Sequence, residues 1–268
     1  MADVYASIAQ SGRDVQQRLA DVIELRAADP RYQAMVRAYL SKIPFAPHAR
    51  VLDVGCGTGS ITRLLAAWPN VDQAVGIDPA PVFIERARRL AASLGNTSFE
   101  EGDGRSLPFA ASSFDVAIIN TTMSHVPQPE RLVEQAFHVL RPHGWLAVFD
   151  GDYATATVAK DEFDPLQACV AAFRANFVHD PWIVRRLPQL VRGGGFELIS
   201  TDSHGYVEAP VGAYMLTWID RGADVLLQNR CIATPTADAL KAEAQRRSAE
   251  QTWFGHIAFA SAIARKPA

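Results

Sequence analysis

The sequence predicts an α/β protein with a doubly wound, Rossmann-like sheet of seven mostly parallel strands. Three observations support this fold class. Short apolar runs alternate with helix-like segments from residue 50 onward, and the first run leads into a loop with glycines at alternate positions. The length of 268 residues suits one large domain. Apolar strands that alternate with helices form parallel sheets covered on both faces.

The first 48 residues predict a helical cap or lid that precedes a core domain of residues 49–268. Val15, Leu19 and Val22 recur close to the 3.6-residue period of a helix. Prolines interrupt this segment at positions 30, 44 and 47. The change to strand-like runs at residue 50 marks the boundary with the core.

The first part of the core is predicted to consist of alternating strands and helices. Strands are expected at residues 50–54, 73–77, 97–100, 114–119 and 145–149. Helices are expected at residues 60–67, 82–94 and 131–140. These units together predict the parallel part of the sheet.

After residue 150 the pattern becomes less regular. Helices are expected at residues 161–177, 182–191, 213–228 and 236–250, and strands at 196–203 and 254–264. The last two strands are not joined by a simple strand–helix repeat, so we expect an antiparallel edge. The insertions at about residues 151–192 and 211–250 are expected to be helical and to contribute to the binding of a substrate.

Composition excludes several function classes. Net charge is −3 with 21% charged residues, so nothing favours nucleic acid or an anionic membrane surface. No apolar run reaches the roughly 18–20 residues of a membrane span. Cys56, Cys169 and Cys231 are far apart and form no zinc motif. We therefore expect a cytoplasmic protein without a metal, as a monomer or homodimer.

The glycine loop after the first strand predicts a cofactor site. Without Cβ atoms, the backbone at Gly55, Gly57 and Gly59 allows close approach of a ligand. A dinucleotide fingerprint would have Gly or Ala where this chain has Ser60. No Gly-Lys-Ser/Thr follows, which excludes a P-loop. An NAD-type and an adenosyl-type cofactor both remain open at this point.

Polar side chains follow neighbouring strands, where open α/β sheets bind their ligands. Asp53 precedes the glycines and suits a ligand with an ammonium group. Asp78 ends the second strand and suits both hydroxyls of a ribose. Asp103 follows the third strand between two glycines and suits an adenine amine, while Asn120 ends the fourth strand.

These motifs together resemble class I S-adenosylmethionine-dependent methyltransferases, over about residues 31–150. The branch with the most similar motifs is the small-molecule one that includes ubiquinone- and menaquinone-type enzymes. The segments that carry the resemblance are Val-Leu-Asp-Val-Gly-Cys-Gly-Thr-Gly at 51–59, Gly-Ile-Asp at 76–78, Gly-Asp at 102–103 with Leu-Pro-Phe at 107–109, Phe-Asp-Val at 114–116 and Leu-Arg-Pro-His-Gly-Trp at 140–145.

The resemblance implies S-adenosylmethionine as cofactor. Its methionine part would lie on the glycine loop with Asp53 near the ammonium group, and Asn120 would line this part through its backbone. Asp78 would bind the ribose and Asp103 the adenine amine. The implied cofactor-binding residues are Asp53, Gly55, Cys56, Gly57, Gly59, Asp78, Pro79, Gly102, Asp103, Gly104, Arg105 and Asn120.

The expected function is in-line methyl transfer to a small-molecule acceptor, driven mainly by positioning and exclusion of water. His125 and Asp152 are the candidate bases, although each suits a loop or turn equally well. Tyr32, Phe177, Trp182 and Trp218 are the candidate acceptor-binding residues, and they favour an apolar or aromatic acceptor. The alternatives are an NAD-type oxidoreductase and a methyltransferase-fold binding module or cyclase that keeps the cofactor as scaffold.

Overall fold

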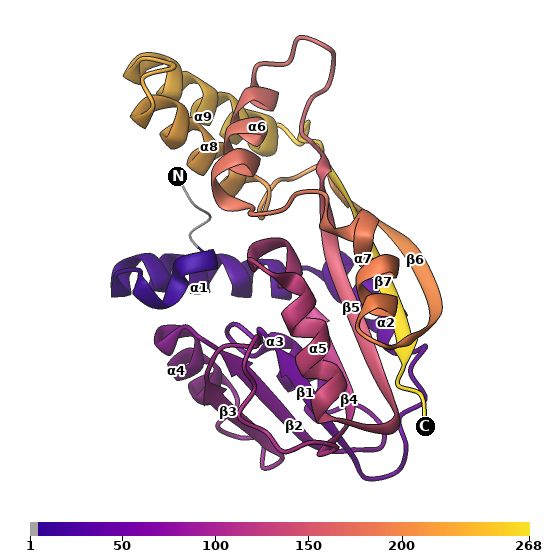
Figure 1. Ribbon diagram of the computed structural model, residues 1–268. Coiled ribbons are helices and arrows are strands. Elements are labelled where there is room, and N and C mark those ends of the chain that lie inside the picture. Colours follow the sequence, from indigo (N-terminus) through magenta and orange to yellow (C-terminus); the bar gives the residue numbers. More distant parts are fainter. Residues whose placement is uncertain (1–4) are drawn as a thin grey trace.

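The computed structural model describes residues 5–268 and contains the expected seven-stranded sheet. Its strand order is β3-β2-β1-β4-β5-β7-β6 (Figure 1). The strands are β1 (Ala49–Val54), β2 (Val71–Asp78), β3 (Thr97–Glu101), β4 (Phe114–Asn120), β5 (Leu140–Thr157), β6 (Glu197–Glu208) and β7 (Gly255–Arg265).

The first five strands form the predicted parallel sheet. β1 pairs in parallel with β2 on one side and with β4 on the other. β2 continues to β3, and β4 continues to β5. The strand order reverses between β1 and β4. At such a switch point the loops after the strands diverge and leave room for a ligand.

The last strand, β7, runs antiparallel to both of its neighbours, β5 and β6. The predicted antiparallel pairing is therefore present at this side of the sheet, and β6 forms the outermost strand. β5 extends well beyond the predicted residues 145–149, because its second half continues to pair with β7 as far as Thr157 opposite His256. This extension carries the chain past the switch point.

Helices cover both faces of the sheet. The α-helices are α1 (Arg13–Ala28), α2 (Pro30–Leu40), α3 (Ser60–Ala66), α4 (Pro81–Leu90), α5 (Pro129–Val139), α6 (Leu166–Phe177), α7 (Leu187–Gly193), α8 (Leu216–Gln228) and α9 (Thr234–Ala249). Short 3₁₀ turns occur at η1 (Tyr5–Gln10), η2 (Met123–His125) and η3 (Ile183–Arg186).

The core lies on the two faces of the sheet because successive strand residues point in opposite directions. Val51 packs on the face covered by α2 and α3, whereas Leu52 packs on the face covered by α5 and α7. Both side chains are fully buried. This alternation explains why the strand runs are apolar throughout.

Proline explains two differences from the predicted helices. The helix expected at 182–191 is a 3₁₀ turn followed by α7, which restarts with Pro188 in its first turn. The helix expected from residue 161 begins only at Leu166, with Pro165 as its N-cap residue. The preceding residues form a loop.

The late helices assemble beyond the carboxyl ends of the parallel strands. α6 packs on α8 through stacked rings of Phe173 and Trp218, whose centroids are 4.8 Å apart. Figure 1 shows α6, α8 and α9 grouped together, with α1 between this group and β1 to β3. Within residues 5–268 no helix combines the length and the apolar character needed to cross a membrane.

Candidate functional site

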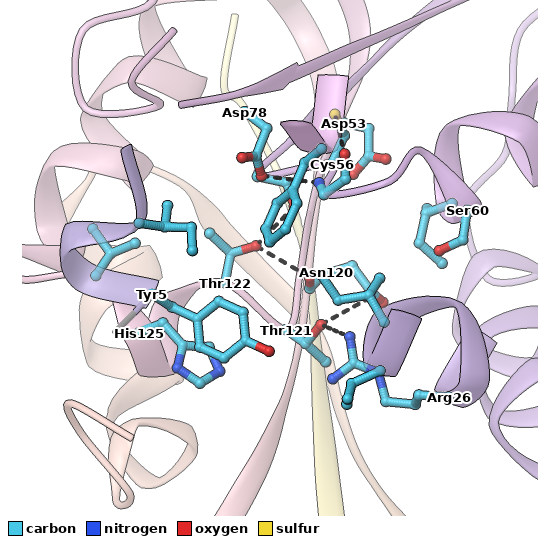
Figure 2. A pocket seen from close by; sticks show the side chains of 18 of the residues that line it. Tyr5, Arg26, Asp53, Cys56, Ser60, Asp78, Asn120, Thr121, Thr122 and His125 are labelled. Atoms are coloured by element: carbon cyan, nitrogen blue, oxygen red, sulfur yellow. Dashed lines mark hydrogen bonds between the residues drawn. The ribbon is translucent and has the colours of Figure 1, made fainter. Parts of the chain in front are cut away.

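A cavity lies at the switch point of the sheet, and its empty space, including its opening to solvent, measures about 930 Å³. Its wall comes from the ends of β1, β2 and β4 and from α1, α6 and α8. In Figure 2, Asp53, Cys56 and Asp78 gather on one side, and Arg26, Tyr5 and His125 lie on the other.

The glycine loop lines this cavity with backbone atoms that no side chain covers. Gly55 has a φ of +74°, which favours glycine, and a Cβ there would lie 2.4 Å from the Thr122 side chain. The amide of Gly57 donates a hydrogen bond to Asp78 Oδ2 at 2.9 Å. The loop is thereby fixed against the end of β2 with its backbone open to a ligand.

Asp53 is a buried carboxylate with one unsatisfied oxygen. Thr62 Oγ1 donates to Oδ2 at 2.7 Å, whereas Oδ1 has no hydrogen-bond partner. Burial, with Asp78 nearby, raises the pKa of Asp53 to about 7. An unpaired buried carboxylate oxygen is costly, so its place at the cavity wall indicates that a ligand supplies the missing donor.

Asp78 is positioned by backbone amides. Gly57 N donates to its Oδ2, and Ala80 N donates to its Oδ1, each at 2.9 Å. Burial raises the pKa of Asp78 to about 6. Each oxygen keeps a lone pair for a further donor, which matches two neighbouring hydroxyls. Pro79 follows and lines the same cavity.

Asn120 lines the cavity, but its side chain is held by two tyrosines of α2. Its Nδ2 donates to Tyr32 Oη at 2.7 Å, and its Oδ1 accepts from Tyr39 Oη at 3.1 Å. Tyr32, predicted to bind the acceptor, is thus buried behind the cavity and supports Asn120. The backbone role expected for Asn120 stays a prediction.

The predicted adenine segment lies outside the cavity wall as defined by the described residues. The Asp103 carboxylate accepts two close hydrogen bonds from Arg105, from Nε at 3.0 Å and from Nη2 at 2.6 Å. This partner lowers the pKa of Asp103. Gly102 and Gly104 flank it, and the adenine role of these four residues stays a prediction.

His125 lines the cavity, whereas Asp152 does not belong to the described wall. The Asp152 carboxylate accepts from Arg185 Nε at 3.0 Å. Behind His125, fully buried Asp150 accepts from Ser124 through both its amide and its hydroxyl. Burial raises the pKa of Asp150, and the charge of His125 opposes that rise. Sequence reasoning overlooked Asp150, which directly follows the predicted strand of residues 145–149.

The aromatic residues predicted to bind the acceptor occupy different positions. Phe177 and Trp218 pack against Phe173, which lines the cavity. Trp182 is half exposed beneath Arg185 and lies away from the described wall. The rings that do line the cavity are Tyr5, Phe83, Tyr153, Phe173 and Tyr214, together with the imidazole of His125.

Two cavity arginines, Arg26 and Arg221, were overlooked in the sequence. Figure 2 shows Arg26 reaching toward Thr121, whose Oγ1 accepts from Nη2 at 2.8 Å. The sequence did carry a signal for Arg26. It follows Val15, Leu19 and Val22 at helical spacing, so an arginine stands where that stripe requires an apolar residue.

Comparison with known proteins identifies a methyltransferase domain in part of the chain. Residues 51–144 match the sequence model of a protein family described as a methyltransferase domain. An uncharacterised 37.1 kDa protein in transposon TN4556 of Streptomyces fradiae is 27% identical, over 82% of this chain and 60% of that protein. Trans-aconitate 2-methyltransferase of Deinococcus radiodurans is 36% identical over 43% of each chain. The chain therefore spans less than two thirds of the length of either relative.

Solved structures show the same fold. The YcgJ protein of Bacillus subtilis has a TM-score of 0.61 and 16% identity, over 88% of this chain and 99% of its own. The [4+2]-cyclase SpnF has a TM-score of 0.55 and 20% identity, over 88% and 81%. Phosphoethanolamine N-methyltransferase 2 of Haemonchus contortus, in complex with S-adenosyl-L-methionine, has a TM-score of 0.52 and 16% identity, over 86% and 52%.

The domain match, the fold and the acids at the strand ends agree with one another. The match over residues 51–144 and the named relatives support the predicted resemblance to class I S-adenosylmethionine-dependent methyltransferases. The predicted fold class is confirmed. The finer resemblance to ubiquinone- and menaquinone-type enzymes stays a prediction.

Proposed function

We propose that this protein transfers a methyl group from S-adenosylmethionine to a small molecule. One observation carries the proposal. Asp53 Oδ1, which has no hydrogen-bond partner, and the Asp78 carboxylate line the same cavity as a group of aromatic side chains between α1, α6 and α8. One end of that cavity suits the methyl donor, and the other end has room for an acceptor.

The residues of this chain fit the cofactor. Asp53 Oδ1 would accept a hydrogen bond from the ammonium group, and Asp78 would accept two from the ribose hydroxyls. Arg26 would hold the carboxylate, because its guanidinium lies beside Thr121 at the end of β4 and makes no ion pair among the described residues. The curated relative from Deinococcus supports the class of reaction.

When bound, S-adenosylmethionine supplies a methyl group activated by its sulfonium. The protein needs to orient the acceptor in line with that group and to exclude water. Helix α1 closes one side of the cavity through Val22 and Ile23, and Phe173 and Tyr214 close the acceptor side. Acceleration would come mainly from this positioning.

His125 is the residue placed to take a proton from an acceptor that has one to lose. Its ring lines the cavity and lies against Tyr5, with ring centroids 4.6 Å apart. Asp150 would favour the protonated imidazole electrostatically and holds the preceding residue, Ser124. Asp152 is engaged by Arg185, so His125 is the base that we propose.

Calorimetric titration with S-adenosylhomocysteine, 5′-methylthioadenosine and NADH tests the cofactor assignment. S-adenosylhomocysteine should bind, and 5′-methylthioadenosine, which lacks the amino-acid part, should bind more weakly. Asp78→Ala should weaken both by about 1–3 kcal/mol, because charge-assisted hydrogen bonds to the ribose are lost.

Asp72→Ala, which removes an exposed carboxylate from the same strand, is the matched control and should change neither affinity. Binding of NADH in preference to S-adenosylhomocysteine would instead support an oxidoreductase. Wild-type affinity in Asp78→Ala would reject the ribose role.

A further inference from the structure

Arg221 is a cation in the acceptor part of the cavity whose guanidinium is only partly satisfied. It lies on α8 and lines the cavity. Its Nε donates to Thr217 O at 3.1 Å, and its Nη2 donates to Thr217 Oγ1 at 3.3 Å. Its Nη1 is buried and has no hydrogen-bond partner. A buried donor without a partner costs about as much as a lost hydrogen bond, so this nitrogen requires an explanation.

The surroundings of Arg221 are aromatic. Its guanidinium carbon lies 4.5 Å from the ring centroid of Phe173 and 5.1 Å from that of Phe177. These two rings, stacked on each other, hold the guanidinium in one orientation. Arg221 is therefore positioned in advance of any ligand.

No carboxylate of residues 5–268 forms an ion pair with Arg221. The nearest acid in sequence, Asp220, interacts electrostatically with Arg221, and it interacts in the same way with Lys241 and Asp224. Lys241 in turn forms an ion pair with Asp224 at 2.5 Å. The protein itself thus leaves the charge of Arg221 without a direct partner.

The charge of the loaded cavity leads to the same conclusion. Apart from His125, its charged wall residues are Asp53, Asp78, Arg26 and Arg221, whose formal charges cancel. S-adenosylmethionine adds one net positive charge, since it carries an ammonium, a sulfonium and a carboxylate. One negative charge on the acceptor would restore neutrality, and a low-dielectric cavity favours such pairing.

We propose that the methyl acceptor is an organic acid whose carboxylate binds Arg221 and whose apolar body packs against Phe173 and Tyr214. A carboxylate matches both the single missing charge and the planar donor edge of a guanidinium. A phosphate monoester would bring between one and two negative charges and fits the balance less well. This inference rests on the proposed function, because the charge balance assumes the bound cofactor.

The test measures binding of small acids to protein saturated with sinefungin, a cofactor analogue whose amino group keeps the positive charge of the sulfonium and cannot transfer a methyl group. The probes are benzoate, phenylacetate and 3-phenylpropanoate, each paired with its primary amide, which has the same shape and no charge; phenyl phosphate is added as a separate arm. We expect at least one acid to bind ten-fold or more tightly than its amide. Arg221→Met should abolish this preference, and Arg221→Lys should keep part of it.

Arg18→Met, which removes an exposed arginine from α1, is the charge control and should leave the preference intact. Thermal unfolding measurements check that each variant is folded. If Arg221→Met does not fold, Arg221→Lys alone is used for the comparison with the wild type. Acids that bind no more tightly than their amides, a preference that survives Arg221→Met, or phenyl phosphate as the tightest probe would each overturn the proposal.

The same experiment separates this inference from the proposed function. S-adenosylhomocysteine affinity is measured first, in the wild type and in Arg26→Met, which should bind it about ten-fold or more weakly. Absence of binding to the wild type would count against the cofactor itself. Normal cofactor binding without acid preference would count against Arg221 alone.

Discussion

Asp53 and Asp78 show that the glycine loop is shaped for a ligand and not for stability. Both carboxylates are buried with raised pKa values, about 7 and about 6. In the folded protein without ligand they hold protons up to higher pH than in the unfolded chain. The unfolding free energy of the ligand-free protein should therefore fall as pH rises from about 4 through 7. Ligand binding recovers this cost, as expected of a functional site.

Cofactor affinity should rise with pH because both aspartates act as carboxylates. Between pH 5 and 8 the affinity for S-adenosylhomocysteine should increase as Asp78 and then Asp53 ionise, by at most about ten-fold per pH unit for each group. Asp53→Asn should weaken binding at pH 8 and flatten the upper part of this curve. Calorimetry across this pH range provides the measurement.

The matched ligand 5′-methylthioadenosine has no ammonium group, so its affinity should follow Asp78 alone. Its pH curve should be the same in Asp53→Asn and in the wild type. If the two ligands gave identical pH curves in the wild type, Asp53 would have no role in binding the amino-acid part.

The sequence allowed prediction of the acids at the strand ends but not of the cavity arginines. Asp53 and Asp78 follow apolar strand runs directly, and the geometry of a parallel sheet brings such residues together. Arg26 and Arg221 stand on helices, where a charged residue is usually exposed. Whether a helix turns such a residue inward depends on its packing, which periodicity alone does not fix.

Helix α1 covers the cavity and is attached to the glycine loop. Its Glu24 accepts hydrogen bonds from Thr58 Oγ1 at 2.5 Å and from Arg63 at 3.0 Å. These bonds join α1 to the glycine loop and to α3. Since α1 also lines the cavity, we expect it to move when ligands enter or leave.

Weakening this attachment should speed ligand release. Glu24→Gln should raise the dissociation rate of S-adenosylhomocysteine several-fold, because the partly buried ion pair with Arg63 is lost. Stopped-flow displacement measures this rate. Glu85→Gln, which removes an exposed ion pair between α1 and α4, is the control and should change it much less. Equal effects of the two variants would argue against Glu24 as the attachment.

The contact between α6 and α8 requires a glycine. A Cβ at Gly222 would lie 2.0 Å from Cys169 O on α6, and a backbone atom cannot give way as a side chain does. Gly222→Ala should therefore lower the unfolding free energy by about 1–3 kcal/mol. Chemical denaturation measures the loss. Gly193→Ala, at a helical position with nothing within 4 Å, should be neutral or stabilising; a similar loss in both variants would contradict this packing.

The elements themselves were largely predictable, with differences at their ends. β1 and β4 match their predicted ranges within one residue because they are short, apolar and parallel. β5 is much longer than predicted, since its second half contains Thr155 and Thr157 and depends on pairing with β7. A strand extension of this kind depends on pairing with residues far away in the sequence, so the local pattern of apolar residues does not predict it.

In the whole molecule, the end of the cavity that we propose binds the cofactor is built by β1, β2 and β4, and the proposed acceptor end is built by α1, α6 and α8. The first comes from contiguous motifs that are also the part matched by the methyltransferase domain model. The second assembles side chains from residues 22 to 221, far apart in the chain. For this reason the motifs predicted Asp53, Asp78 and the glycine loop at the cavity, whereas all four acceptor candidates lie behind or away from the described wall.

Methyl transfer itself is the most direct test of the proposed activity. The protein is incubated with a fraction of small organic acids from a cell extract and methyl-labelled S-adenosylmethionine, and the mixture is analysed by mass spectrometry. We expect S-adenosylhomocysteine together with a labelled product that carries one added methyl group, and Asp78→Ala should form both much more slowly. Folded wild-type protein that binds S-adenosylhomocysteine but yields no labelled product above that variant, from acidic or neutral fractions alike, would contradict the assignment as a methyltransferase.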